Sequence, residues 1–191
     1  VNSTFINYPM SDNLERQVFF NIKKLNMKTL VIHIKDKSTD FLSHIYENKG
    51  FTVITDEIKN SKKKKLIKEH DRIIMLGHGT EDGLFGDSKF MIDLKDADAL
   101  FKKEIVAIWC NADKFVKKHK LKGFYSGMFI SEIYEAYYEG IDDSTIHEIE
   151  KSNNDFAITL GKYLDDNNIL EAVKSEYNDE DSLVVAFNRD R

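Results

Sequence analysis

Residues 72–79 read RIIMLGHG, and this stretch decides the fold that we expect for the chain. A short apolar run between a charged residue and a glycine is typical of a strand buried on both faces. A second run of this kind, residues 104–110, reads EIVAIWC and ends at the only cysteine of the sequence. Each run therefore ends in a reactive side chain, His78 or Cys110, at the carboxyl end of a predicted strand.

The rest of the chain alternates between predicted strands and predicted helices. Further strands are expected at 29–34, at 51–54, within 123–129 and at Leu183–Phe187, with a hairpin over 83–93. Helical spacing of apolar residues predicts helices at 41–46, 60–70 and 97–101, from about 114, at 130–137 and over most of 143–176. Apolar strands that alternate with helices indicate an α/β fold with a mostly parallel central sheet flanked by helices.

The length of 191 residues fits one domain that carries an extension. Apolar residues between positions 14 and 25 recur at helical spacing, which predicts an N-terminal helical extension over 1–27. We expect residues 28–191 to form a single α/β domain.

Composition excludes several classes of site and partner. A single cysteine excludes intramolecular disulfides and zinc sites built from several cysteines, and we expect no metal and no organic cofactor. The net charge of −5 gives no general attraction to nucleic acid or to anionic lipid. No apolar run is long enough to span a bilayer, and residues 1–10 do not resemble a signal peptide. These features predict a cytoplasmic protein that needs neither nucleic acid nor a membrane as a partner.

The carboxyl ends of parallel strands meet at one edge of a sheet, where ligands of such folds bind. A histidine and a cysteine at that edge are a candidate base and nucleophile, because the imidazole takes the thiol proton and the thiolate attacks a carbonyl. The backbone N–H groups of Gly79 and Cys110 are then candidates for an oxyanion hole. We predict that His78 and Cys110 face one crevice.

The two strands with these endings resemble the core of the caspase-like (clan CD) cysteine peptidases. That group includes caspases, metacaspases, gingipains, clostripain, legumain, separase and the bacterial CHAT-domain proteins. The matching stretches are 72–79, 104–110 and GFYSGMF at 123–129. The resemblance implies a three-layer caspase-like sandwich and a cysteine endopeptidase that acts on a protein or peptide without a cofactor. It also implies that Cys110 is the nucleophile, that His78 is the catalytic histidine, and that Gly79 and Cys110 form the oxyanion hole.

Four departures exclude a true caspase and favour a more distant bacterial relative. The Gln-Ala-Cys-x-Gly signature is missing, and caspases place about 50 residues between histidine and cysteine, more than separate positions 78 and 110 here. Trp109 replaces the small residue common before the cysteine, and Ala112 stands where caspases have glycine. The same departures leave open an alternative function: a catalytically degenerate caspase-like module that acts in protein–protein interaction.

Three further residues are candidates for binding substrate. Asp113 lies where it can line a pocket for a basic side chain, but an N-cap for a helix from Lys114 is the interpretation we favour. Ser126 and Met128 lie on the stretch that borders the primary pocket in the relatives.

The glycines of 77–83 fit neither a dinucleotide fingerprint nor a P-loop. We interpret the lysines of 62–65 and 117–122 as solvated helix surfaces.

Overall fold

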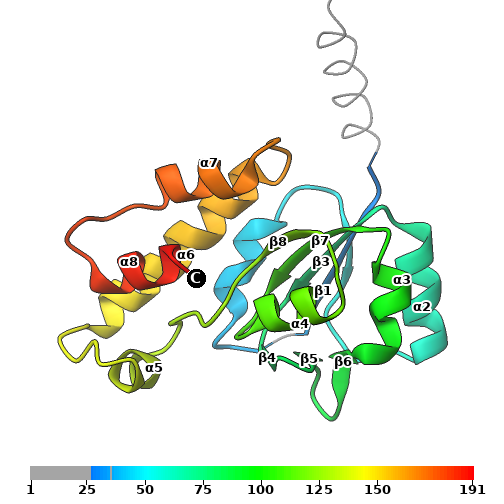
Figure 1. Ribbon diagram of the computed structural model, residues 1–191, viewed down its shortest axis with the longest axis horizontal. Coiled ribbons are helices and arrows are strands. Elements are labelled where there is room, and N and C mark those ends of the chain that lie inside the picture. The colour runs from blue at the N-terminus through cyan, green and yellow to red at the C-terminus, as the bar shows by residue number, and fades with distance from the viewer. Residues whose placement is uncertain (1–26, 35) are drawn as a thin grey trace, which may run out of the picture.

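The computed structural model describes residues 27–34 and 36–191 and has a five-stranded parallel sheet at its centre (Figure 1). The order of the strands is β2-β1-β3-β7-β8, and each neighbouring pair runs parallel. Their bounds are β1 Thr29–His33, β2 Thr52–Ile54, β3 Arg72–Leu76, β7 Glu104–Ile108 and β8 Gly123–Tyr125. The predicted strands at 29–34, 51–54, 72–76 and 104–109 are confirmed to within one residue at each end.

The central strands are apolar on both faces because both faces are covered. In β3, Ile73 and Met75 belong to one buried cluster, whereas Ile74 and Leu76 belong to a second cluster on the opposite face. The predicted α/β class, with helices flanking a parallel sheet, is therefore confirmed.

One face carries three helices and a small antiparallel sheet. The helices are α2 Asn60–Glu69, α3 Ala97–Leu100 and α4 Ala112–Lys118. The small sheet has the order β4-β5-β6, with bounds Gly79–Thr80, Gly83–Phe85 and Phe90–Ile92, and η2 Leu94–Asp96 follows it. Strands β5 and β6 are the hairpin that the sequence predicted within 83–93.

The other face is covered by a 3₁₀ helix and by the C-terminal helices (Figure 1). These are η1 Asp40–Ile45, α6 Ile146–Tyr163, α7 Ile169–Glu176 and α8 Leu183–Arg189, with α5 Ile133–Tyr138 packed beside α6 and α8 in a smaller cluster. Helix α6 and η1 approach closely at Gly161, where a Cβ atom would lie 2.8 Å from the His44 carbonyl oxygen. This close contact holds the segment that follows β1 beside α6.

The strand predicted at Leu183–Phe187 is wrong, because these residues form helix α8. Ser182 caps the helix by accepting a hydrogen bond from the Val185 N–H at 3.3 Å. Val184, Val185 and Asn188 are its buried residues, a spacing that suits one face of a helix rather than a strand. The β-branched pair raised the strand propensity, but the cap and the packing against α6 decide the outcome.

Smaller corrections concern the ends of elements. The helix predicted at 41–46 is 3₁₀, the helix predicted at 130–137 begins only at Ile133, and the strand within 123–129 ends at Tyr125. The predicted helical extension over 1–27 lies outside the described residues, which begin at Met27. Within the described ranges, no helix is both long enough and apolar enough to cross a membrane.

A buried ion pair joins the small sheet to α2. The Lys63 ammonium lies 2.6 Å from Asp96 Oδ2 and donates a second hydrogen bond, also of 2.6 Å, to the Met91 carbonyl oxygen. Both side chains of the pair are almost wholly buried. Met91 lies on β6, which is joined through β5 to β4, the strand directly after His78.

We expect Lys63→Ala to lower the free energy of unfolding by about 3–5 kcal/mol, since it leaves the Asp96 carboxylate buried without a partner charge. The double variant Lys63→Met, Asp96→Leu removes both charges and should lose clearly less. Urea denaturation of the three proteins measures the difference. An equal or larger loss in the double variant would contradict the role given to the pair.

Candidate active site

Pairing of β3 with β7 brings His78 and Cys110 to the same edge of the sheet. Leu76 is in register with Ile108, and the Gly77 N–H extends the ladder by donating to the Ile108 carbonyl oxygen at 3.1 Å. His78 and Cys110 each follow two residues after that registered pair. Neighbouring strands are about 4.8 Å apart, so the two residues leave the sheet side by side. The His78 side chain is 37% exposed and Cys110 is partly exposed, so solvent reaches both.

Trp109 fixes the segment after His78 against the end of β7. Its indole N–H donates to the Thr80 carbonyl oxygen at 3.0 Å, and the ring is buried. A Cβ atom on residue 79 would lie 2.3 Å from Trp109 Cδ1, so only glycine fits there. The bulky residue before the cysteine, which departs from the family pattern, therefore has a structural role between the two candidate residues.

The backbone N–H groups of Gly79 and Cys110 are both available to a ligand. The Phe85 N–H donates to the His78 carbonyl oxygen at 2.8 Å, which makes Gly79 and Leu84 a non-hydrogen-bonded pair of the antiparallel ladder. The Gly79 N–H consequently points away from β5. In the described part of the chain, the Cys110 N–H has no acceptor other than its own sulfur.

The Cys110 thiol lies among backbone groups and a carboxylate that follow β8. Its Sγ atom is 3.8 Å from the Phe129 carbonyl oxygen and 4.0 Å from Glu135 Oε1. Burial raises the pKa of the Cys110 thiol; the Phe129 backbone opposes this shift, while the Glu135 carboxylate adds to it. The thiol is therefore protonated at neutral pH, and a base must remove its proton before it can attack.

The His78 imidazole is held by two residues that follow β1. Its Nε2 atom lies 2.7 Å from Ser38 Oγ, and Ser38 Oγ donates to Asp36 Oδ1 at 2.5 Å. Since the single hydroxyl hydrogen of Ser38 goes to Asp36, Nε2 is the donor toward Ser38. The Nδ1 atom of a neutral His78 then carries the free lone pair. Hydrogen bonds from Ser38, with a smaller effect of His78, lower the pKa of Asp36, so Asp36 is ionised in any neutral buffer.

Ser38 and Asp36 were not predicted from the sequence, although a signal for them existed. Both residues follow the first strand directly, at the sheet edge where the strand-end rule also placed His78 and Cys110. Glu135 lies 25 residues beyond Cys110 on α5, and no spacing rule connects it to the site.

Two of the three predicted substrate-binding residues, Asp113 and Ser126, contact other residues of the chain. Helix α4 begins at Ala112, so Asp113 lies in its first turn; the predicted N-cap role is wrong, and the carboxylate pairs with Lys117 Nζ at 2.8 Å. Ser126 is buried and donates its hydroxyl to the Trp109 carbonyl oxygen at 3.1 Å. Met128 lies between Gly127 and Phe129, beside the carbonyl group that Cys110 contacts.

No group of three or more potential metal ligands occurs among the residues that the structure describes. No protein-family model, no curated protein and no solved structure matches this chain. The resemblance to caspase-like peptidases therefore stays a prediction from the residues quoted above.

Alkylation of Cys110 by iodoacetamide tests the environment of the thiol, because the sequence has no other cysteine. A raised pKa means less thiolate at pH 7, so we expect the rate to reach half its maximum at a pH above the ordinary cysteine value of about 8.5. Glu135→Gln removes the facing carboxylate and should move that midpoint to lower pH. Glu139→Gln, at the C-cap of the same helix, is the control. A wild-type midpoint at or below the ordinary value would contradict this description.

Proposed function

We propose that the chain is a cysteine endopeptidase in which Cys110 is the nucleophile and His78 the general base. The observation that carries this proposal is the register of β3 with β7, which sends both residues off the same sheet edge at equivalent positions. A partly exposed thiol and an oriented imidazole at one edge of the sheet are the two groups that nucleophilic catalysis of acyl transfer needs. The caspase-like sequence resemblance supports the same reaction.

The steps follow from the available atoms. His78 Nδ1 takes the thiol proton as Sγ bonds to the peptide carbonyl carbon, and the carbonyl π electrons move to oxygen. The N–H groups of Gly79 and Cys110 stabilise that oxyanion. When the intermediate collapses, the C–N bond breaks and His78 returns the proton to the leaving amine. Water then attacks the thioester, with His78 again as the base, and releases the carboxylic acid and the thiol.

Ser38 and Asp36 act as positioning residues. Their hydrogen bonds orient Nε2 and fix the plane of the ring, and the Asp36 carboxylate oxygen lies 3.7 Å from Nε2. The substrate would be a protein or peptide, cleaved without a metal or an organic cofactor. Composition favours action in the cytoplasm, independently of nucleic acid and of membranes.

A second function, a catalytically degenerate module for protein–protein interaction, is favoured by one observation. The sulfur contacts Phe129 and Glu135, and His78 contacts Ser38, so the two candidate residues each bind other partners in this conformation. Catalytic hydrogen bonds are often long before substrate binds, which is why we favour the enzyme.

Cleavage of a peptide library tests the enzyme directly. We expect Cys110→Ala to abolish cleavage and His78→Ala to reduce kcat/KM by about 10²–10⁴-fold, the usual contribution of a general base. His147→Ala, on the exposed first turn of α6, is the matched control and should cleave at the wild-type rate. Cleavage that survives Cys110→Ala would reject the proposal. A wild-type chain that cleaves nothing, and whose alkylation rate is unchanged in His78→Ala, would support the interaction module.

Ser38→Ala should lower kcat by about 10- to 100-fold, less than the roughly 10⁴-fold loss caused by removing a buried carboxylate partner. KM should change little, because Ser38 acts through His78, and Ser38→Thr should restore most of the rate by keeping the hydroxyl. Ser43→Ala is the control, since Ser43 lies on η1 and its hydroxyl donates to the exposed Glu47 carboxylate. A purely structural role would give equal losses in the Ala and Thr variants.

A further inference from the structure

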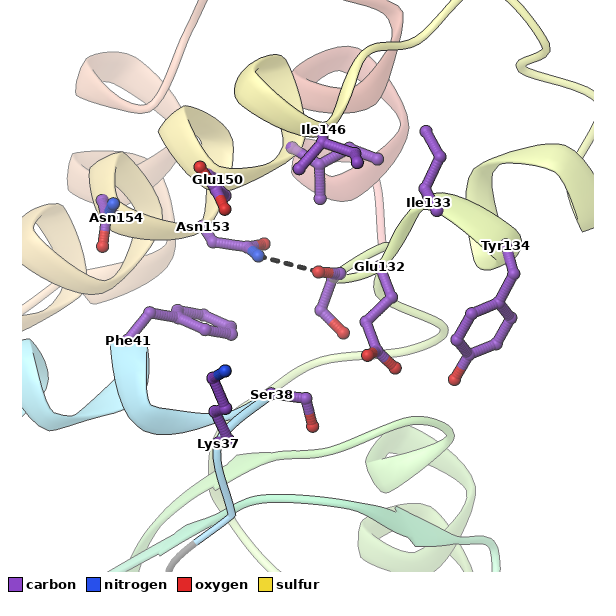
Figure 2. A pocket seen from close by; sticks show the side chains of 12 residues that line it. Lys37, Ser38, Phe41, Glu132, Ile133, Tyr134, Ile146, Glu150, Asn153 and Asn154 are labelled. Atoms are coloured by element: carbon purple, nitrogen blue, oxygen red, sulfur yellow. Dashed lines mark hydrogen bonds between the residues drawn. The ribbon is translucent and has the colours of Figure 1, made fainter.

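A pocket of about 290 Å³ lies between strand β8 and the C-terminal helices. Its lining comes from β8 and the segment after it, from one residue of α6, from α7 and from the end of α8. It shares no lining residue with the cavity of about 360 Å³ shown in Figure 2, which lies beside Ser38 and Ser131. The volume is just below the range of typical small-molecule sites, about 300–1,000 Å³, so it suits a small ligand.

The pocket exists because the sheet ends at β8 while the chain continues past that edge. In the described part of the chain, β8 pairs with β7 alone and is therefore an edge strand. The segment after α8 returns to this edge, where the Gly127 N–H donates to the Arg191 carbonyl oxygen at 2.8 Å. Space is left between this return, the edge strand and α7.

Aromatic and aliphatic side chains form the inner wall of the pocket. The rings of Phe129 and Phe156 lie 4.8 Å apart, centroid to centroid, and belong to the buried cluster on this face of the sheet. Phe124 on β8 is half-buried and packs against the same cluster, and Leu170 on α7 is 50% exposed. A ring placed here extends an existing aromatic cluster, which is more favourable than the buried apolar area alone predicts.

The buried polar side chains of the lining already have hydrogen-bond partners. The Tyr177 hydroxyl lies 2.7 Å from Ser152 Oγ, and Asn188 Oδ1 accepts from the Ile130 N–H at 2.7 Å. The Ser126 hydroxyl donates to a backbone carbonyl oxygen at 3.1 Å. Since these groups are satisfied, the inner part of the pocket offers a ligand apolar contact rather than hydrogen bonds.

The rim of the pocket collects the positive charge of this part of the chain. Residues 123–191 contain sixteen acidic and only five basic side chains, yet three of the basic ones, Lys174, Arg189 and Arg191, line this pocket. The other two basic side chains lie on α6 and pair with carboxylates outside the lining. Asp190 is the single acidic side chain of the lining.

The Arg189 guanidinium is fixed on the rim but only partly used. Its Nε donates to the Lys174 carbonyl oxygen at 2.9 Å, and within the described ranges Arg189 forms no ion pair. The Lys174 ammonium has one ionic partner there, Asp190 Oδ1, at 3.8 Å, and that side chain is 81% exposed. Cations without a buried counter-charge, at the outer end of an apolar pocket, indicate a ligand with an apolar body and an anionic end.

We propose that this pocket binds a small aromatic carboxylate, with its ring against the phenylalanines of the inner wall and its carboxylate on Arg189 and Lys174. The planar guanidinium matches the two oxygens of a carboxylate. Asp190 beside Lys174 favours a single negative charge over a phosphate monoester, whose charge is about −1.5 to −2 at pH 7. The inference goes beyond the proposed function and does not rest on it, because neither His78 nor Cys110 lines this pocket.

An NMR titration of the full chain, followed at the Gly123 and Lys174 backbone amides, reports binding at this pocket. The probes are 3-phenylpropanoate, its neutral amide, octanoate and phenyl phosphate. We expect 3-phenylpropanoate to bind about tenfold more tightly than its amide, because the carboxylate gains charge-assisted hydrogen bonds. It should bind about two- to tenfold more tightly than octanoate, which has no ring. Equal affinities of acid and amide, or tighter binding of octanoate or phenyl phosphate, would overturn the assignment.

Arg189→Gln separates the charge of the rim from the shape of the pocket. It should reduce the affinity for 3-phenylpropanoate to that for the amide and leave the affinity for the amide unchanged. Lys162→Gln, on α6 and outside the lining, is the control and should bind both probes as the wild type does. An equal loss for both probes in Arg189→Gln, or a similar loss in Lys162→Gln, would contradict the role given to the guanidinium.

Leu170→Trp tests the cavity itself. Because Leu170 is half exposed, the larger side chain can be accommodated while it fills the space that the ligand needs. We expect the affinities for the acid and for the amide to fall together, by at least tenfold. Ile158→Trp, on α6, is the matched control, since Ile158 is 53% exposed and lies outside the lining. Undiminished binding in Leu170→Trp, or an equal loss in Ile158→Trp, would overturn the proposal.

Discussion

The register between β3 and β7 is the constraint on which the candidate site depends. A slip of one residue in a strand turns every side chain to the opposite face, so it would place His78 and Cys110 on different sides of the sheet. Both faces of these strands are apolar, and an apolar pattern alone specifies register weakly. Specific contacts at the two ends of the β3–β7 pair must therefore fix the register.

Those contacts are an ion pair at one end and a shape fit at the other. Arg72 and Glu104 open the two strands in register, and the buried guanidinium donates to Glu104 Oε1 at 2.8 Å while a second nitrogen binds Asp165. At the carboxyl ends, the Trp109 ring fills the space that a side chain at Gly79 would need. A slip by one residue would separate the charges and drive the indole into a residue with a Cβ atom. Fold and site are thus fixed by the same few contacts.

The sequence alone predicts those elements of this structure whose local residue pattern is compatible with a single type of secondary structure. Apolar runs such as 72–76 and 104–108 read as buried strands, and the strand-end rule located His78 and Cys110. The same rule covers Asp36 and Ser38, but these residues become recognisable only when the Ser38 hydroxyl is seen between the carboxylate and the imidazole. Residues 183–187 show the limit of local propensity, since two valines favour a strand while Ser182 and the packing against α6 make a helix. The pocket shown in Figure 2 is lined by residues from 37–41 and from 131–154, and only the folded chain brings these two segments together.

The neighbouring glutamates 132 and 135 at the start of α5 have different roles because their carboxylate oxygens accept different hydrogen bonds. Glu135 Oε2 already accepts hydrogen bonds from the Ser131 N–H, the Ser131 hydroxyl and the Glu132 N–H, and it is buried. Its carboxylate therefore holds the start of α5 in place and sets the electrostatic surroundings of Cys110, with little capacity left for a ligand. Glu132 is half-buried, and its carboxylate accepts a hydrogen bond from the Tyr134 hydroxyl, which raises the pKa of Tyr134 to about 12. Glu135 therefore acts on the surroundings of the Cys110 thiol, whereas Glu132 acts on the neighbouring Tyr134 hydroxyl.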